Sequence, residues 1–508
     1  EDLTFWLMHQ RQDSESTTSL FRANILSVGS NSLNSNYDRD SVSFDGGGGH
    51  KGSIKSNSTT LKVDWDIGDY TLTSITSLQS VTDRFGRGDI DGGFGCALAF
   101  ICAGPSGPPS IPFNPFASPF AGPIDTGGNQ ELEQFTQEIR LASNLDGPIN
   151  YQVGVFYFED DFDGLSSAQN FGAPAFLAAS SSNIENTTIA IFGQGSYDIS
   201  DQLTVTAGLR YTDDVKDAEH IRYENGLPSI FLPKINLEDD NISWDLSFSY
   251  AATEAGQLYG RMASGFRAPT IQDRLEDDPT VTTADSETIQ SYELGYKAQY
   301  NRLRYNAAAF YYVVDDIQLT AVGGASNSTT LLNGDEGVGY GFELEIEYVA
   351  LDNLTLSGGF GYAKTEINDS SLAVPGGALT TVTDPLNAAG LALIDGNPFQ
   401  HAPEWTANIE IDYVYPLQGN AEIYAYSDWK FRGETNDFLY ESIEYTTDTQ
   451  YEGGLKFGYR NLDKNYQLGF FARNITDEEN IIGGIDFANL LAYTNEPRTY
   501  GVEASWSF

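Results

Sequence analysis

Two cysteines have the clearest chemistry in this chain. Cys96 and Cys102 lie six positions apart in "GGFGCALAFICAGPSGPPS", a stretch whose glycine, proline and serine content is typical of a loop. Thiols this close normally pair in an oxidising compartment, and pairing is favoured over a metal-binding or catalytic role. The sequence therefore predicts a disulfide between Cys96 and Cys102.

The other reactive side chains do not form an enzyme's active site. The histidines, His9, His50, His220 and His401, are scattered, and the sequence contains no nucleophile elbow, zinc motif or phosphate-binding loop. We expect a protein that is not an enzyme and has no catalytic, cofactor or metal site, with Ca²⁺ in an acidic loop as the one exception to test.

Carboxylates dominate the charge. The chain has 72 acidic and 27 basic residues, and this balance excludes a nucleic-acid partner, which would require a basic surface. Hard oxygen ligands for Ca²⁺ cluster in "EDDFDG" (159–164) and "RLEDD" (274–278), although neither has the spacing of an EF-hand loop. Solvated acidic loops are the alternative interpretation.

The elements that position these residues read as strands. We expect 18 segments of strand character, joined alternately by short and long connections. The short ones have the Gly, Asn and Asp content of hairpin turns; they are 67–70, 144–149, 199–202, 252–257, 300–303, 350–353, 416–420 and 461–465. The long ones, such as 85–128, 162–182, 217–238 and 368–400, are rich in Gly, Ser, Pro and Asp.

Long loops on every second connection distinguish a membrane barrel from a soluble sandwich. No run of 18 apolar residues is present, which excludes a helical span, whereas the strands have the roughly 9–11 residues that an oblique crossing needs. The predicted fold is all-β, a transmembrane antiparallel β-barrel over residues 1–508.

Alternation assigns the two faces of each strand. Glu343 and Glu345 alternate with apolar residues in "FELEIEY", so we expect them to face a wet lumen or a plug. The final strand, "EPRTYGVEASWSF", likewise separates a polar register that includes Glu503 from an apolar one. The residues expected to touch lipid are Tyr500, Val502, Trp506 and Phe508.

The order of several stretches resembles the barrel domain of TonB-dependent outer-membrane receptors along nearly the whole chain. The matching stretches are "YTLTSITSLQS" (70–80), "QFTQEIRLAS" (134–143), "LTVTAGLRYTDD" (203–214), "ASGFRAPTIQDRL" (263–275), "SYELGYKAQ" (291–299), "GVGYGFELEIEY" (337–348), "ARNITDEEN" (472–480) and the terminal strand. Each match is weak alone, and their shared order is what makes the resemblance specific.

This resemblance implies a receptor that takes up a scarce solute, with a ferric siderophore as the family default, using the inner-membrane proton-motive force. It implies a Gram-negative outer membrane, extracellular long loops and periplasmic short turns. It also implies lipid and lipopolysaccharide around the barrel, a small-molecule ligand, the TonB–ExbB–ExbD complex as partner through an N-terminal plug, and accessory outer-membrane subunits as further candidates. Because such barrels have 22 strands around a plug, we expect the plug and the first ~4 strands to be absent from this sequence.

Three alternatives stay open, one of which is an adhesin-like structural barrel whose loops bind a partner without solute uptake. The solute could be a carbohydrate, vitamin B12 or another non-iron nutrient, since an acidic surface does not steer anionic siderophores. Alternatively, 18 strands could close on themselves as a passive, porin-like diffusion channel.

The resemblance assigns site residues only loosely. Arg267 in "GFRAP" (265–269) matches a family signature, where a structural role at the end of a strand is favoured over ligand contact. Phe113, Phe116 and Phe120 belong to an aromatic loop that either stacks on a ligand or packs as a lid. Arg140 and Arg210 are expected to face the lumen and to bond with the plug or with other lumen residues.

Overall fold

The computed structural model describes residues 2–17, 25–35, 37–40, 51–89, 124–170, 178–224, 227–272, 280–323, 328–377, 379–485 and 490–507. These ranges contain strands, turns and irregular segments, and no helix. Accordingly, the described residues provide no helix with the length and apolar character to span a membrane.

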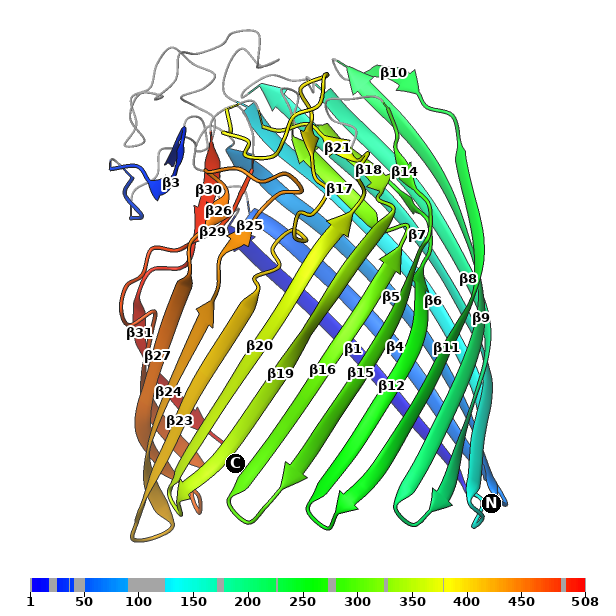
Figure 1. Cartoon of the computed structure of the whole chain (residues 1–508), viewed down its shortest axis with the longest axis vertical. Helices are drawn as coiled ribbons and strands as arrows, with labels where there is room; N and C mark the ends of the chain where they lie inside the picture. The colour runs from blue at the N-terminus through cyan, green and yellow to red at the C-terminus, as the bar shows by residue number, and fades with distance from the viewer. Residues whose placement is uncertain are drawn as a thin grey trace.

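One large antiparallel sheet makes up the molecule and curls into a barrel wall (Figure 1). It has 19 strands, of which the five-residue β10 only pairs with the upper end of β9, so 19 − 1 = 18 strands form the wall. The 19 strands of the sheet are β1 Leu3–Thr17, β4 Lys51–Ile67, β5 Tyr70–Asp89, β6 Ile124–Ser143, β7 Ile149–Asn170, β8 Ala178–Ser200, β9 Leu203–Glu224, β10 Leu227–Phe231, β11 Ile235–Thr253, β12 Gly256–Arg267, β15 Glu287–Gln299, β16 Leu303–Asp315, β19 Glu336–Leu351, β20 Leu354–Asn368, β23 Trp405–Leu417, β24 Ala421–Arg432, β27 Gln450–Asn461, β28 Tyr466–Arg473 and β31 Thr499–Trp506.

Short two-stranded ribbons occur within the long connections. They are β2 (Leu26–Ser27) with β3 (Ser30–Leu33), β13 (Thr270–Ile271) with β14 (Thr283–Ala284), β17 (Gln318–Gly323) with β18 (Ser328–Asn333), β21 (Ala373–Val374) with β22 (Ala392–Leu393), β25 (Thr435–Asn436) with β26 (Thr446–Thr447), and β29 (Ile481–Ile485) with β30 (Leu491–Thr494). All the labelled ribbons lie at one end of the barrel (Figure 1).

The eight predicted short turns lie where the strands reverse at the opposite end of the wall (Figure 1). Backbone angles explain the turn residues, since Gly68, Gly419, Asn420 and Asn465 have positive φ. The prediction that short and long connections alternate, and with it the barrel fold, is confirmed.

Neighbouring strands pair in an unbroken series from β1 with β4 to β28 with β31. In the part of the chain that the structure describes, no ladder joins β1 to β31.

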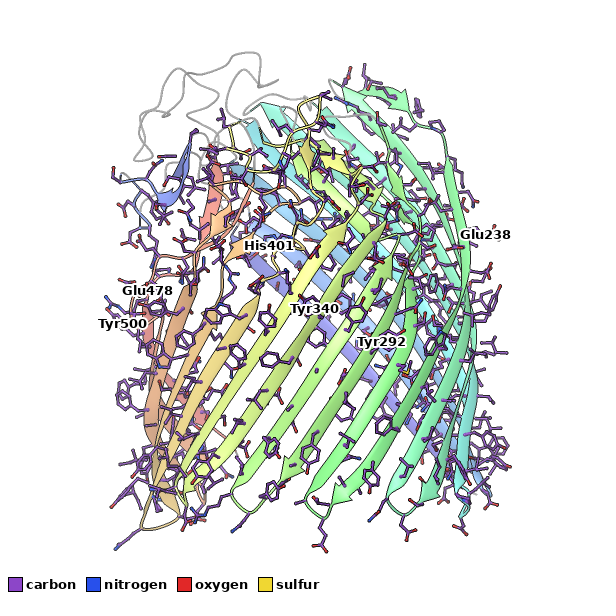
Figure 2. The ribbon with its side chains drawn as sticks, viewed as in Figure 1. Glu238, Tyr292, Tyr340, His401, Glu478 and Tyr500 are labelled. Carbon is purple, nitrogen blue, oxygen red and sulfur yellow. The ribbon has the colours of Figure 1, made fainter. Side chains whose placement is uncertain are left out.

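Register places side chains on two faces. Tyr292, Tyr311 and Tyr340 are direct cross-strand partners, and Tyr292 and Tyr340 lie on the outside of the wall (Figure 2). Directly paired residues share a face and successive residues alternate, so this row fixes which register of each strand faces out. The outward register carries most of the exposed large apolar side chains, including Phe342 and Ile346 of β19.

Several strands extend further than the sequence predicted. The expected connection 162–182 overlaps the ends of β7 and β8, and the expected connection 217–238 overlaps β9, β10 and β11. These boundaries were wrong because strands were recognised by apolar alternation, which stops where the outward side chains become polar. The backbone hydrogen bonds between the strands continue beyond that point.

Among the described residues, the principal buried apolar core lies mostly in the long connections, together with the ends of β16 and β20. It joins Leu26 to residues of four later connections, and its members are Ile25, Leu26, Val314, Ile317, Leu319, Ala321, Ile367, Val374, Ala392, Ile394, Phe438, Leu439, Tyr440, Tyr445, Ile481, Leu490 and Ala492. We call the described parts of connections 25–40, 316–335, 369–404, 433–449 and 474–498 the loop cap.

Candidate functional site

The inner wall is the first candidate site, because a solute moving through the barrel would contact it. Glu343 and Glu345 both lie on the inward register of β19. Glu345 Oε2 accepts a hydrogen bond from Asn306 Nδ2 at 3.0 Å, and Glu347 Oε2 lies 3.1 Å from Arg304 Nη2. Glu345 and Glu347 are therefore matched by donors of β16, whereas Glu343 lies opposite Ala308.

Arg140 and Arg210 also lie on the inward register. One cross-strand row runs from Arg140 on β6 through Gly154 and Phe192 to Arg210 on β9. Arg140 Nη1 lies 3.2 Å from Glu138 Oε1 of its own strand. Gly154 and Phe192 therefore separate the two arginines in this row, and only Arg210 contacts the Phe192 ring.

Glu503 anchors the last strand from inside the barrel. Its Oε1 lies 2.5 Å from Lys456 Nζ and accepts a hydrogen bond from Gln467 Nε2 at 2.9 Å. Gln467 also donates to Tyr424 Oη at 2.9 Å. A Cβ on Gly469 would lie 2.4 Å from that hydroxyl, so the missing side chain lets Tyr424 lie across two strands.

The predicted lipid-facing residues of β31 lie on the opposite register. Tyr500, Val502 and Trp506 are 81%, 60% and 71% exposed, and Tyr500 points away from the wall (Figure 2). Phe508 lies outside the described residues. Arg498, just before the strand, has its Nη2 3.5 Å from Asp477 Oδ2 in the loop cap.

Arg267 is the last residue of β12. Its Nη1 lies 3.6 Å from Glu287 Oε1 at the start of β15, and its side chain is largely exposed. This position suits an ion pair between neighbouring strand ends. The other loop candidates lie outside the described residues; they are Cys96, Cys102, Phe113, Phe116 and Phe120.

The acidic stretch at 159–164 was expected in a loop, and this is wrong, because it lies within β7. Asp161 of this stretch shares an outward row with Glu133, Glu185 and Asp217 of three other strands. No group of three or more metal-ligating side chains that could hold an ion occurs in the described ranges. The second acidic stretch, 274–278, is not among them, so Ca²⁺ binding there stays a prediction.

Glu444 connects three parts of the loop cap. Its side chain is buried, with only 1% exposed, and accepts hydrogen bonds from Gly29 N at 2.6 Å and Thr381 N at 2.7 Å. Thr381 Oγ1 donates a third bond at 2.8 Å. Two connections supply backbone N–H donors, from Gly29 and Thr381, and the third supplies the accepting carboxylate. Each of these groups would be costly to bury without its partner, so Glu444 fixes how the three connections pack.

Asp437 is the most strongly perturbed acid of the loop cap. Burial raises its pKa to about 6, against the opposing influence of His401 and Arg432. His401 Nδ1 lies 3.3 Å from Asp437 Oδ1, while Asp437 Oδ2 is buried without a hydrogen-bond partner. His401 lies toward the loop end of the barrel (Figure 2) and has a positive φ of 55°.

Asp384 and Glu441 form a second acidic pair in the cap. Asp384 Oδ2 accepts from Glu441 N at 2.6 Å and from Asn397 Nδ2 at 3.3 Å. Burial raises the pKa of both carboxyls, and Asp384 further raises that of Glu441. The cap therefore contains several acids that resist ionisation near its buried core.

Sequence reasoning missed the surroundings of Arg210 and all of the cap's buried acids. Phe156, Phe158 and Phe162 alternate in "VFYFEDDF", so a period-two count would have placed them on one face. For Glu444 no such signal exists, because its partner Gly29 is 415 positions away.

This geometry, an antiparallel barrel wall with an apolar exterior, a polar interior and long connections at one end, defines the class of transmembrane β-barrels. A family model described as "TonB dependent receptor-like, beta-barrel" matches residues 8–448. The chain belongs to this family. Barrels of this family are outer-membrane proteins of Gram-negative bacteria and act as receptors and transporters, not as enzymes. The prediction that the chain is not an enzyme is therefore confirmed.

Among curated relatives, the pesticin receptor of Yersinia enterocolitica is 26% identical over 225 residues, or 43% of this chain and 32% of the relative. The rhizobactin receptor of Rhizobium meliloti is 21% identical over 442 residues, or 78% of this chain and 55% of the relative. The matches thus span about a third and about half of these relatives.

Solved structures show the same fold. The ferric yersiniabactin uptake receptor of Yersinia pestis matches with a TM-score of 0.74 at 15% identity, covering 99% of this chain and 67% of that one. The ferric-catecholate import receptor of E. coli matches with a TM-score of 0.68 at 14% identity, covering 99% and 72%.

Proposed function

We propose that this barrel belongs to an energised outer-membrane receptor that imports a scarce solute, with a ferric siderophore as the first candidate. The family match over residues 8–448 carries the proposal, and the names of the relatives, which include rhizobactin and ferric yersiniabactin receptors, support iron as the cargo. The proposal includes a plug that contacts the TonB–ExbB–ExbD complex, extracellular long loops, and lipid and lipopolysaccharide around the outer wall.

The inner wall carries cations as well as carboxylates. Although the chain has a net charge of −45, cations such as Arg140, Arg210 and Lys216 lie on the inward register of neighbouring strands. The outward rows of the same strands carry carboxylates, including Asp161 and Glu185. Arg140 and Lys216 are ion-paired with Glu138 and Asp214 on the same inward register, and β19 adds Glu343 and Glu345, so a solute inside the barrel meets charges of both signs.

Growth under iron limitation tests the choice of cargo. Cells that lack this receptor should grow more slowly on a ferric siderophore as sole iron source, and the deficit should disappear with excess soluble iron. Unchanged growth and iron-independent expression would favour a carbohydrate, vitamin B12 or another non-iron nutrient.

A passive channel remains the second candidate. It predicts solute entry that follows the concentration gradient and does not respond to loss of the proton-motive force. Uptake by cells treated with a protonophore therefore separates the two functions.

A further inference from the structure

A groove of about 560 Å³ opens on the outer face of β11, β12, β15 and β16. Cross-strand pairing places Phe248, Gly260, Leu294 and Ala309 in one row of the outward register across these four strands. All four residues line the groove. Small-molecule sites have volumes of about 300–1,000 Å³, so this depression is large enough for an extended apolar group.

Small residues form the floor of the groove. A Cβ on Gly260 would lie 2.4 Å from the Phe248 ring, so this ring lies over the glycine. Ala309 adds only a methyl group to β16 and is exposed. Leu294 lies between these two positions and is 55% exposed, so an occupant of the groove contacts its side chain as well.

The rim toward the long connections is the next row of the same register. It consists of Leu246, Met262, Tyr292 and Tyr311. The ring centres of Tyr292 and Tyr311 are 6.3 Å apart, and Tyr292 lies on the outside of the wall, above the short turns (Figure 2). The groove therefore lies on the short-turn side of this row.

A tyrosine cluster marks the short-turn end of the same strands. Tyr296 and Tyr305 have ring centres 6.0 Å apart, and Tyr300, in the turn between β15 and β16, stacks on Tyr305 at 6.4 Å. The amphipathic ring of tyrosine prefers the boundary between membrane and water. An apolar occupant of the groove can therefore extend toward a polar group at that boundary.

The groove does not depend on the interior of the barrel, because these rows belong to the outward register. Its four strands lie in the middle of the pairing series and have β9 and β19 as described neighbours. Exposed apolar residues continue the outer surface on both sides, with Leu209 on β9 and Phe342 on β19. A bilayer around the wall therefore meets the groove directly.

Packing distinguishes the groove from the rest of the lipid-facing wall. Lipid chains are as apolar as the side chains of the outward register, so the hydrophobic effect does not favour one place on the wall over another. A chain in the groove gains dispersion contacts with the floor and the rim together, whereas a chain on a flat surface is contacted from one side.

We propose that this groove holds one acyl chain of a phospholipid from the periplasmic leaflet. The occupant is committed by continuity with the lipid-facing wall and by the position of the groove on the short-turn side. This inference rests on the proposed function, which places the short turns in the periplasm, and it adds a lipid partner at a defined place on the wall.

Photocrosslinking in the purified full-length receptor tests the place. The receptor is reconstituted in bilayers of phosphatidylethanolamine and lipopolysaccharide and then transferred to detergent, which removes freely exchanging lipid. Benzoylphenylalanine replaces either Tyr311 at the rim or Phe470 on the outer face of β28, two aromatic residues that are 44% and 47% exposed. We expect the phosphatidylethanolamine adduct at position 311 to exceed that at position 470 at least fivefold.

Filling the groove tests its occupancy. Native mass spectrometry counts the phospholipid that the receptor retains in detergent, and we expect Ala309→Leu to reduce this retention at least fivefold. Ala425→Leu is the matched control, because Ala425 lies on the outward register of β24 and does not line the groove. Leu294→Phe fills the groove from an exposed position and keeps the test decisive if Ala309→Leu does not fold.

Four results would overturn the proposal. They are equal adducts at the two positions, equal retention by wild type and the folded variants, an adduct with lipopolysaccharide in place of phospholipid, and crosslinking to a second receptor.

The two proposals fail separately. A phospholipid adduct at position 311, combined with iron-independent growth, would reject iron as the cargo and keep the groove. Normal uptake of the ferric siderophore, combined with no phospholipid adduct, would reject only the groove.

Discussion

Val502 and Glu503 are adjacent in β31, yet their side chains lie on opposite sides of the barrel wall. Val502 is 60% exposed on the outer face, and Glu503 lies 2.5 Å from Lys456 Nζ on the inner face. One step along the strand therefore separates lipid from lumen, which makes this pair a direct test of the register.

A charge on the outer face should impair insertion. We expect Val502→Arg to reduce the folded fraction in the outer membrane, because a cation on the lipid face costs about 2–4 kcal/mol at the midplane and less near the interfaces. Ser505→Arg, on the inner register, should be tolerated. The heat-modifiable gel shift of outer-membrane fractions measures both, and equal behaviour of the two variants would show that the register is wrong.

A methyl group on Gly341 should destabilise the wall. Its Cβ would lie 1.9 Å from the backbone oxygen of Tyr362, which cannot move without disturbing the ladder between β19 and β20. We expect Gly341→Ala to cost about 1–3 kcal/mol, as overpacked sites do. Gly208→Ala is the control, because its nearest neighbours lie at 3.7 Å. The gel shift after heating measures the unfolding temperature of each variant. If this temperature falls equally for both variants, the steric explanation is contradicted.

Removing Glu444 should loosen the loop cap. Glu444→Ala leaves the backbone N–H groups of Gly29 and Thr381 without their acceptor, at about 1–3 kcal/mol for each buried group. We expect faster proteolysis within 369–404, monitored by mass spectrometry of intact cells. Glu434→Ala, at an exposed position of the same cap, should leave the rate unchanged. Equal rates for wild type and Glu444→Ala would indicate that the carboxylate does not hold the cap.

The cap should lose stability as pH rises through 6. Burial raises the pKa of Asp437 to about 6 from an ordinary 3.8, so the folded cap holds this proton more tightly than the unfolded cap does. Its stabilising contribution is complete below about pH 4 and is lost as pH rises through the folded value.

Hydrogen exchange of the amides in 435–447, corrected for intrinsic rates, should show an opening free energy about 1 kcal/mol higher at pH 5 than at pH 7.5. The Asp437→Asn variant should lack this step. A step of the same size in the variant would assign it to another group.

Sequence alone predicted what depends on local periodicity. Alternation in "TYGVEASW" assigned both faces of β31, and turn residues such as Gly68 and Asn465 located the short connections. It failed at Asp161, whose acidic surroundings resemble a loop although the ladder with β6 and β8 continues past them.

The candidate site was less predictable, because it depends on register between strands. Arg210 could be placed on the inner face from its own strand, but its contacts with Phe156 and Phe192 require β7, β8 and β9 to be aligned. The buried position of Asp437 similarly depends on packing between distant connections.

Energised import by this receptor is tested most directly by the uptake of a radiolabelled ferric siderophore into iron-starved cells, with and without a protonophore. We expect accumulation that requires this receptor and stops when the proton-motive force is removed. Receptor-dependent accumulation that continues at the same rate with the protonophore would contradict it and identify a passive channel.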